Sequence, residues 1–165
     1  HMNNSEFVSV ALKLLDNEIE KISYLTDQLD KSPDEKKKNI AVYKCAKYRY
    51  ASLINVRSSL WHNYRCGKIS DPGYSHHLLL PFDEILKKHK NLVEICKSAP
   101  VGRQQDYSLY YSIIAFSSEM ISELKTKLKS SDDWEATELK ERIKGFETAV
   151  SCLDKAWKDG EEVVQ

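Results

Sequence analysis

The sequence predicts an all-α protein, a single-domain antiparallel bundle of five or six helices. Apolar residues recur at three- and four-residue spacing along most of the chain, which is the spacing that lines one face of a helix. The 165 residues include only five Gly and four Pro, too few for the frequent turns of an all-β domain. An apolar fraction of 41% and a charged fraction of 30% are typical of a globular domain rather than of a disordered chain.

The chain has the length of one domain. His1-Met2 is interpreted as a cloning remnant and start residue, which leaves residues 3–165 as a single helical domain of ordinary size. The longest apolar run, at residues 78–82, is far shorter than the roughly 18 residues of a membrane-spanning helix. No membrane partner is therefore expected.

Two helical segments are predicted in the first part of the chain. The first covers residues 5–30 and ends at Lys31-Ser32-Pro33, because proline disfavours helix in the residue before it. The second begins at Pro33 and extends to Cys66, either as one long helix or with a break near Lys38-Asn39. The apolar face of the first segment consists of Phe7, Ala11, Leu14, Leu15, Ile22, Leu25 and Leu29. That of the second consists of Tyr43, Ala46, Tyr50, Leu53, Ile54, Leu60, Trp61 and Tyr64.

Three further segments complete the predicted bundle. The third covers residues 76–97 and is interrupted by Pro81, and the fourth covers residues 104–129. The fifth is expected to be capped by Ser130 or Ser131, with acidic residues at its positive end. The fifth segment is predicted to bury Trp134, Leu139, Ile143, Phe146, Val150, Leu153 and Trp157. Short connections between such helices favour antiparallel packing.

The charge of the chain is balanced overall but uneven along its length. The formal net charge is +0, which argues against nucleic acid as a direct partner, since a nucleic-acid-binding domain is usually strongly basic. Residues 1–33 and 131–165 carry an excess of acids, whereas residues 34–72 carry an excess of Lys and Arg. If the two acidic segments pack side by side, the protein has an acidic face and a basic face.

The cysteine pattern indicates free thiols. Cys45, Cys66, Cys96 and Cys152 are widely spaced, form no Cys-x-x-Cys pair and follow no signal peptide, so a disulfide framework is not expected. In apolar helical surroundings a free cysteine behaves as a small hydrophobic residue. The pattern favours a reducing, cytoplasmic location.

Catalytic and metal-binding patterns are weak, and we expect neither an enzyme nor a bound cofactor. Arg57 and His62 fit the Arg-x4-His spacing of HEPN-type ribonucleases, although chance produces such a spacing easily in a chain of this composition. His62 and Cys66 could face one metal ion together with His76 and His77 across the following turn. We expect no metal, because adjacent histidines on a helix point about 100° apart. Phosphate-binding loops and other catalytic signatures are also missing.

Tyrosine is unusually frequent and clustered. Seven of the nine tyrosines fall in the second and fourth segments, and their rings are predicted to pack in a thin core with the hydroxyl groups at its rim. The alternative is that some of them are anchors on a protein-binding surface. The seven residues are Tyr43, Tyr48, Tyr50, Tyr64, Tyr107, Tyr110 and Tyr111.

One stretch of the chain resembles a known family. Residues 50–67 have the pattern Tyr-x2-Leu-x3-Arg-x2-Leu-x3-Tyr-x-Cys-Gly, which is expected to end a helix. A turn and a new apolar helix are predicted after it, and further along the chain comes Asp106-Tyr107-Ser108-Leu109-Tyr110. This arrangement, over residues 40–125, resembles the N-terminal helical region of PoNi-type immunity proteins. The resemblance implies a protein that binds and blocks a cognate bacterial toxin, with a nuclease effector as the expected partner.

The charge pattern is compatible with that function. A nuclease active site is basic, so a protein that blocks it should present carboxylates. The first and last segments carry the acids predicted to bind the toxin: Asp16, Glu20, Asp27, Glu135, Glu138, Glu141 and Asp159. The alternative functions are a HEPN-like ribonuclease that uses Arg57 and His62, and a small adaptor or secretion chaperone that binds its partner in an apolar helical groove.

Overall fold

The structure is a computed structural model, and it describes residues 4–66 and 108–164. These residues form five helices, α1 (Asn4–Asp30), α2 (Pro33–Lys38), α3 (Ile40–Cys66), α6 (Ser108–Leu128) and α7 (Asp133–Val164), and no strand. The all-α prediction is confirmed. The predicted segment 76–97 lies outside the described residues.

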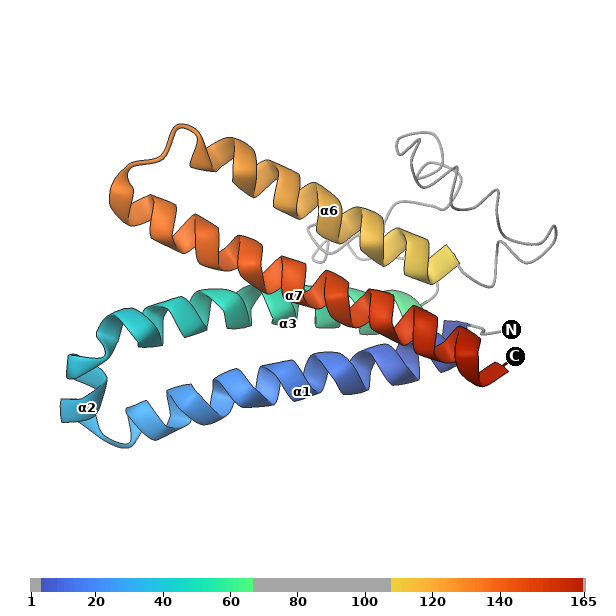
Figure 1. The fold of residues 1–165 in the computed structure, drawn as a ribbon, viewed down its shortest axis with the longest axis horizontal. Helices are drawn as coiled ribbons and strands as arrows, with labels where there is room; N and C mark the ends of the chain where they lie inside the picture. Colours follow the sequence, from blue (N-terminus) through green and yellow to red (C-terminus); the bar gives the residue numbers. More distant parts are fainter. Residues whose placement is uncertain (1–3, 67–107, 165) are drawn as a thin grey trace.

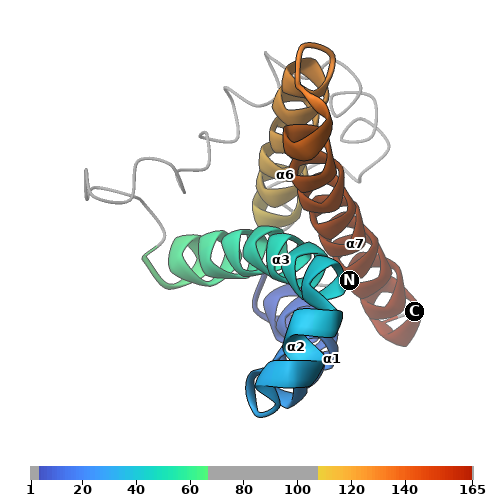
Figure 2. The same cartoon turned by 90° about the vertical axis from the view of Figure 1, so that its left-hand side faces the viewer.

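The long helices form two antiparallel hairpins (Figure 1). α1 and α3 make the first hairpin, with α2 in its turn, and α6 and α7 make the second. α7 is the helix that joins them, because it packs against α3, α6 and α1. α1 and α6 run in one direction and α3 and α7 in the other, so the pair at the centre of the bundle is parallel (Figures 1 and 2).

Asn39 separates α2 from α3, so the second predicted segment is broken where a break was considered. The Asn39 backbone N–H donates to the carbonyl oxygens of Glu35 and Lys36, at 3.0 and 3.2 Å. Its side-chain Nδ2 also donates to the Glu35 carbonyl at 2.9 Å. The carbonyls of Glu35 and Lys36 near the end of α2 thereby have partners without a continuous helix.

The predicted serine cap of α7 is wrong. The hydroxyl of Ser130 donates to the Lys127 carbonyl at 3.3 Å, and that of Ser131 to the Leu128 carbonyl at 2.9 Å. Both serines therefore bind the end of α6. At the start of α7 the Asp132 Oδ1 accepts a hydrogen bond from the Glu135 backbone N–H at 3.3 Å. A carboxylate there is also favoured by the positive end of the helix dipole.

Four helices contribute to one hydrophobic core. Fully buried side chains come from α1, α3, α6 and α7 and include Phe7, Val8, Leu15, Leu53, Val56, Leu60, Tyr111, Ile113 and Leu153. At one edge of this core the Tyr110 and Trp157 rings stack with centroids 4.4 Å apart, and the Tyr110 hydroxyl donates to Asp154 Oδ1 at 2.7 Å. Tyr110 thus has a packed ring and a hydrogen-bonded hydroxyl, as predicted for the tyrosine-rich segments.

The close approach of α3 and α7 depends on Gly145. A Cβ atom at Gly145 would lie 2.6 Å from the Arg49 carbonyl oxygen and 2.7 Å from the Ser52 Cβ. Only glycine permits this crossing, because the nearest obstacle is backbone. Next to it the Ser52 hydroxyl donates to the Arg142 carbonyl at 2.8 Å, which fixes the two helices in register.

Four residues predicted to be in the core are exposed. The exposed fractions are 73% for Trp134, 40% for Trp61, 38% for Tyr64 and 37% for Leu25. Trp134 and Tyr64 lie in the first and last turns of their helices, and Leu25 and Trp61 lie five residues before the ends of theirs. Near a helix end, periodicity alone does not ensure burial, because the neighbouring helices need not cover that part of the face. Trp61 and Tyr64 instead contact each other, with ring centroids 6.1 Å apart.

Candidate partner-binding surface

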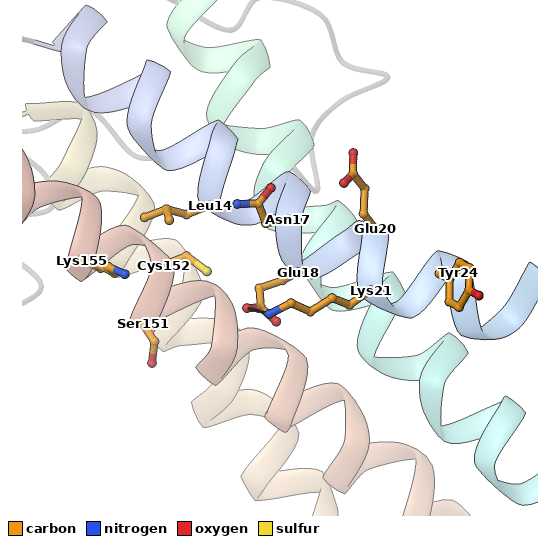
Figure 3. Close-up of a pocket in the computed structure, with 9 residues that line it drawn as sticks. All are labelled: Leu14, Asn17, Glu18, Glu20, Lys21, Tyr24, Ser151, Cys152 and Lys155. Atoms are coloured by element: carbon orange, nitrogen blue, oxygen red, sulfur yellow. Dashed lines mark hydrogen bonds and ion pairs between the residues drawn. The ribbon is translucent and has the colours of Figure 1, made fainter.

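A surface groove of about 810 Å³ lies between α1 and α7 (Figure 3). α1 contributes Leu14, Asn17, Glu18, Glu20, Lys21 and Tyr24, and α7 contributes Ser151, Cys152 and Lys155. Most of the lining residues are polar or charged, but much of the surface they present to the groove is apolar, so the groove is compatible with the adaptor alternative as well.

The charges in the groove are balanced rather than acidic. Figure 3 shows the head groups of Glu18 and Lys21 together between the helices, and their Oε1 and Nζ atoms are 3.1 Å apart. Lys155 adds a second positive charge from α7. The two acidic segments of the sequence do pack side by side, but lysines interleave with their carboxylates.

Cys152 is half-buried beside α1. Burial raises the pKa of the Cys152 thiol, and the negative charge of Glu18 raises it further. Since the thiolate is the reactive form, the thiol is a poor nucleophile near neutral pH. Cys152 therefore acts as an apolar part of the groove rather than as a reactive group. Neither Cys45 nor Cys152 forms a disulfide.

The outer face of α1 combines an aromatic ring with two acids. Glu20, Tyr24 and Asp27 are spaced by four and three residues, which places them on one face of the helix. The exposed fraction of Tyr24 is 69%, and both acids are exposed as well. In Figure 3 the carboxylate of Glu20 points away from α7. We call Glu20, Tyr24 and Asp27 the α1 stripe; it borders the groove, which Glu20 and Tyr24 also line.

Asp16, the first of the predicted toxin-binding acids, is bound within the fold. Its two carboxylate oxygens accept hydrogen bonds from Nε and Nη2 of Arg57, the second at 3.2 Å. This bidentate contact joins α1 to α3, and the hydrogen bond to Asp16 raises the pKa of the Arg57 guanidinium. Asp16 can contact a partner only if this pair is broken or shared.

Glu138 and Glu141 on α7 are also paired. Glu138 Oε1 lies 3.2 Å from Nη2 of Arg142, one turn further along the same helix. Glu141 lies between two cations, at 3.4 Å from Arg49 Nε on α3 and 3.1 Å from Lys144 Nζ. The Glu141 side chain is only 14% exposed, so it contributes to the α3–α7 contact rather than to the surface.

Three of the predicted acids remain open to a partner. Glu20 and Asp27 on α1 and Glu135 on α7 are exposed, and within residues 4–66 and 108–164 no ion pair involves their carboxylates. The side chain of Asp159 lies outside the described part of α7. Sequence reasoning could not separate the paired from the unpaired acids, because the pairs with Arg57 and Arg49 connect residues far apart in the chain.

The two groups of the ribonuclease alternative do not converge on one helix face. Arg57 and His62 are five residues apart on α3, which corresponds to a rotation of about 140° around the helix axis. The guanidinium of Arg57 is held by Asp16. In the described part of the chain, no group of three or more His, Cys, Asp or Glu residues is arranged to hold a metal ion. His76 and His77 lie outside it.

Sequence reasoning missed Tyr24 and the groove. The signal for Tyr24 was present, because the predicted apolar face of α1 leaves positions 20, 24 and 27 on its opposite side, where a tyrosine is unexpected. The groove has no such signal. It depends on how α1 and α7 cross, which involves residues about 135 positions apart in the sequence.

These features define an all-α helical bundle with a surface groove beside the α1 stripe. No protein-family model, curated protein or solved structure matches the chain. No described helix is long and apolar enough to cross a bilayer.

Proposed function

We propose that this chain is a binding protein, not an enzyme, and that it acts as an immunity protein by covering the active site of a toxin. The observation that supports this most directly is the α1 stripe, where an exposed tyrosine stands between two unpaired acids beside a groove. Tyrosine is among the residues most enriched at the energetic centres of protein interfaces. The immunity role and the nuclease partner rest on the family resemblance of residues 40–125.

The charges of the stripe suit a basic partner. In a nuclease active site, Glu20 and Asp27 would take positions that substrate phosphates otherwise occupy. The Tyr24 ring would supply apolar contact area at a low cost in side-chain entropy, and the groove would receive a protruding side chain or helix of the toxin. The Asp16–Arg57 pair, one turn before Glu20, would hold α1 in place.

The proposal is tested by co-expression with the product of the adjacent gene, which should encode the toxin. Tyr24→Ala should weaken binding about 30-fold or more, the effect of losing an interface hot spot. Glu20→Lys/Asp27→Lys should abolish protection of the cells and slow association. A Glu135→Lys variant tests whether the interface extends along α7.

A charge-matched control uses two exposed acids outside the predicted set. Glu123→Lys/Glu147→Lys changes the net charge of the protein by the same amount as the α1 double variant, and it should keep protection intact. If both double variants protect equally, the interface is not on the α1 stripe. If cells die equally with and without the wild-type chain, the immunity function itself is refuted.

A further inference from the structure

A second exposed surface lies at the end of the molecule, away from the groove. We call it the α2 tip, and it consists of α2 and the first turns of α3, residues 33–47. Figures 1 and 2 place α2 at the extremity of the bundle, where it protrudes beyond the long helices. Residues 34–47 contain five lysines and two acids, so the tip is basic in a protein of zero net charge.

Internal contacts fix the α2 tip to the rest of the fold. Lys36 Nζ lies 2.8 Å from Asp30 Oδ1 and 4.2 Å from the centroid of the Tyr43 ring. Lys47 Nζ approaches the same ring from α3, at 5.5 Å. These contacts use Lys36 to anchor α2 against α1 and α3. Lys37, Lys38 and Lys44 are exposed, and Lys38 Nζ lies 3.9 Å from Glu35 Oε1.

Two exposed aliphatic side chains lie close to these lysines in the sequence. Ile40 is 42% exposed and Val42 is 50% exposed. Lys38, next to them in the chain, has a side chain that is 74% exposed. Both aliphatic residues belong to the first turn of α3, where no described helix covers them. The tip therefore carries two branched apolar side chains, about 200° apart around the first turn of α3, together with exposed lysines and the exposed acids Asp34 and Glu35.

We infer that the α2 tip docks on the anionic surface of a lipid bilayer. Lysines beside exposed aliphatic residues suit this partner, because the ammonium groups meet anionic headgroups while Ile40 and Val42 enter the boundary with the acyl chains. Docking of this kind requires no membrane-spanning helix. It departs from the expectation of no membrane partner, which rested on the absence of a spanning segment.

The same composition disfavours the other macromolecular partners. Protein interfaces are depleted in lysine and depend on exposed Trp, Tyr and Arg, whereas the Tyr43 ring is half-buried under lysines. Single-stranded nucleic acid binding requires exposed aromatic faces for base stacking. The first arginine after the tip, Arg49, is paired with Glu141 at 3.4 Å.

The strength of docking follows from the number of groups involved. Each lysine close to an anionic surface strengthens binding about fivefold, so the loss of two should weaken it about 30-fold. Replacing Ile40 and Val42 by serine removes several buried carbon atoms and should weaken binding more than about tenfold. The loss caused by removing lysines should diminish in high salt, because salt screens charges, whereas the loss caused by removing Ile40 and Val42 should persist.

The test is co-sedimentation of the full chain with vesicles. One set of vesicles contains phosphatidylcholine alone, and the other contains phosphatidylcholine with phosphatidylserine. We expect binding to the second set only. The loss should exceed about 30-fold in Lys37→Glu/Lys38→Glu, because each substitution also adds a negative charge, and should be the stated one in Ile40→Ser/Val42→Ser. The matched control is Lys13→Glu/Lys158→Glu, which makes the same change in net charge at exposed positions away from the tip and should bind as the wild type does. Circular dichroism checks that each variant is folded.

Three results would overturn the inference. The first is a wild-type chain that binds neither set of vesicles or binds both equally. The second is a control variant that loses as much binding as the tip variant, because the effect would then come from net charge alone. The third is binding to a duplex or single-stranded oligonucleotide that Lys37→Glu/Lys38→Glu abolishes, with no vesicle binding.

Discussion

Substituting alanine for Gly145 tests whether the crossing of α3 and α7 determines the stability of the bundle. A Cβ at this position would lie 2.6 Å from the Arg49 carbonyl oxygen, well inside ordinary van der Waals contact. The obstacle is backbone, so no side-chain rotation relieves it and the helices must separate by several tenths of an ångström. Separation on that scale forfeits a quarter or more of the dispersion attraction across the contact.

The magnitude follows from three effects. Overpacking of a core costs about 1–3 kcal/mol, and the upper end applies here because the clash involves backbone. The Ser52–Arg142 hydrogen bond, now 2.8 Å long, would stretch, at a cost of about 1 kcal/mol. The higher helix propensity of alanine returns about 1 kcal/mol. We therefore expect the free energy of unfolding to fall by about 3 kcal/mol and the melting temperature by about 6–12 °C.

Urea denaturation followed by circular dichroism measures this change. Lys140→Ala, on an exposed position of the same helix, is the control and should change the free energy of unfolding by less than about 0.5 kcal/mol. Gly145→Val should destabilise the protein more than Gly145→Ala. An unchanged or higher urea midpoint for Gly145→Ala would refute the close approach, since it is what an unobstructed helical glycine would show.

Three further predictions concern single side chains. Tyr110→Phe removes the 2.7 Å hydrogen bond to Asp154 and should lower the free energy of unfolding by about 1–2 kcal/mol in urea denaturation, because an ionised acceptor loses its donor. Burial raises the pKa of the Cys152 thiol, so its alkylation by iodoacetamide at pH 7–8, followed by mass spectrometry, should be slower than that of glutathione; an equal rate would contradict its burial. The hydrogen bond from Lys36 lowers the pKa of Asp30 below its ordinary 3.8, so the stability that Asp30 provides over Asp30→Asn should be present at neutral pH and vanish as the pH falls through that lowered pKa. A difference that persists in strong acid would exclude the charged pair as its source.

The sequence predicts the helices better than it predicts their surfaces. The 3.6-residue period and the stop signal at Ser32-Pro33 locate α1, because helix ends are encoded in a few neighbouring residues. The same period misplaces Trp134, which has the spacing of a core residue but lies where α7 has only begun to meet its neighbours. Burial at a helix end depends on where the other helices stop, and that information is not local.

In the candidate site, too, local features were predictable from the sequence, whereas contacts between helices were not. Glu20 and Asp27 were predicted as partner-binding acids, and their exposure follows from the apolar face on the other side of α1. Asp16 was predicted on the same grounds, yet Arg57 neutralises it from another helix. Which acid meets an arginine depends on the rotation and offset of α1 against α3. A charge pattern along one helix does not contain those two quantities.

The central place of α7 affects the order in which the protein can fold during its synthesis. α7 packs against α1, α3 and α6, yet it is translated after all of them. At about 5–20 residues per second, the ribosome needs several seconds to proceed from the end of α3 to the end of α7. Throughout that interval the apolar side chains of α1 and α3 that α7 later covers lack this partner. We therefore expect the nascent chain to be most prone to aggregation, and most open to chaperone binding, before α7 is complete.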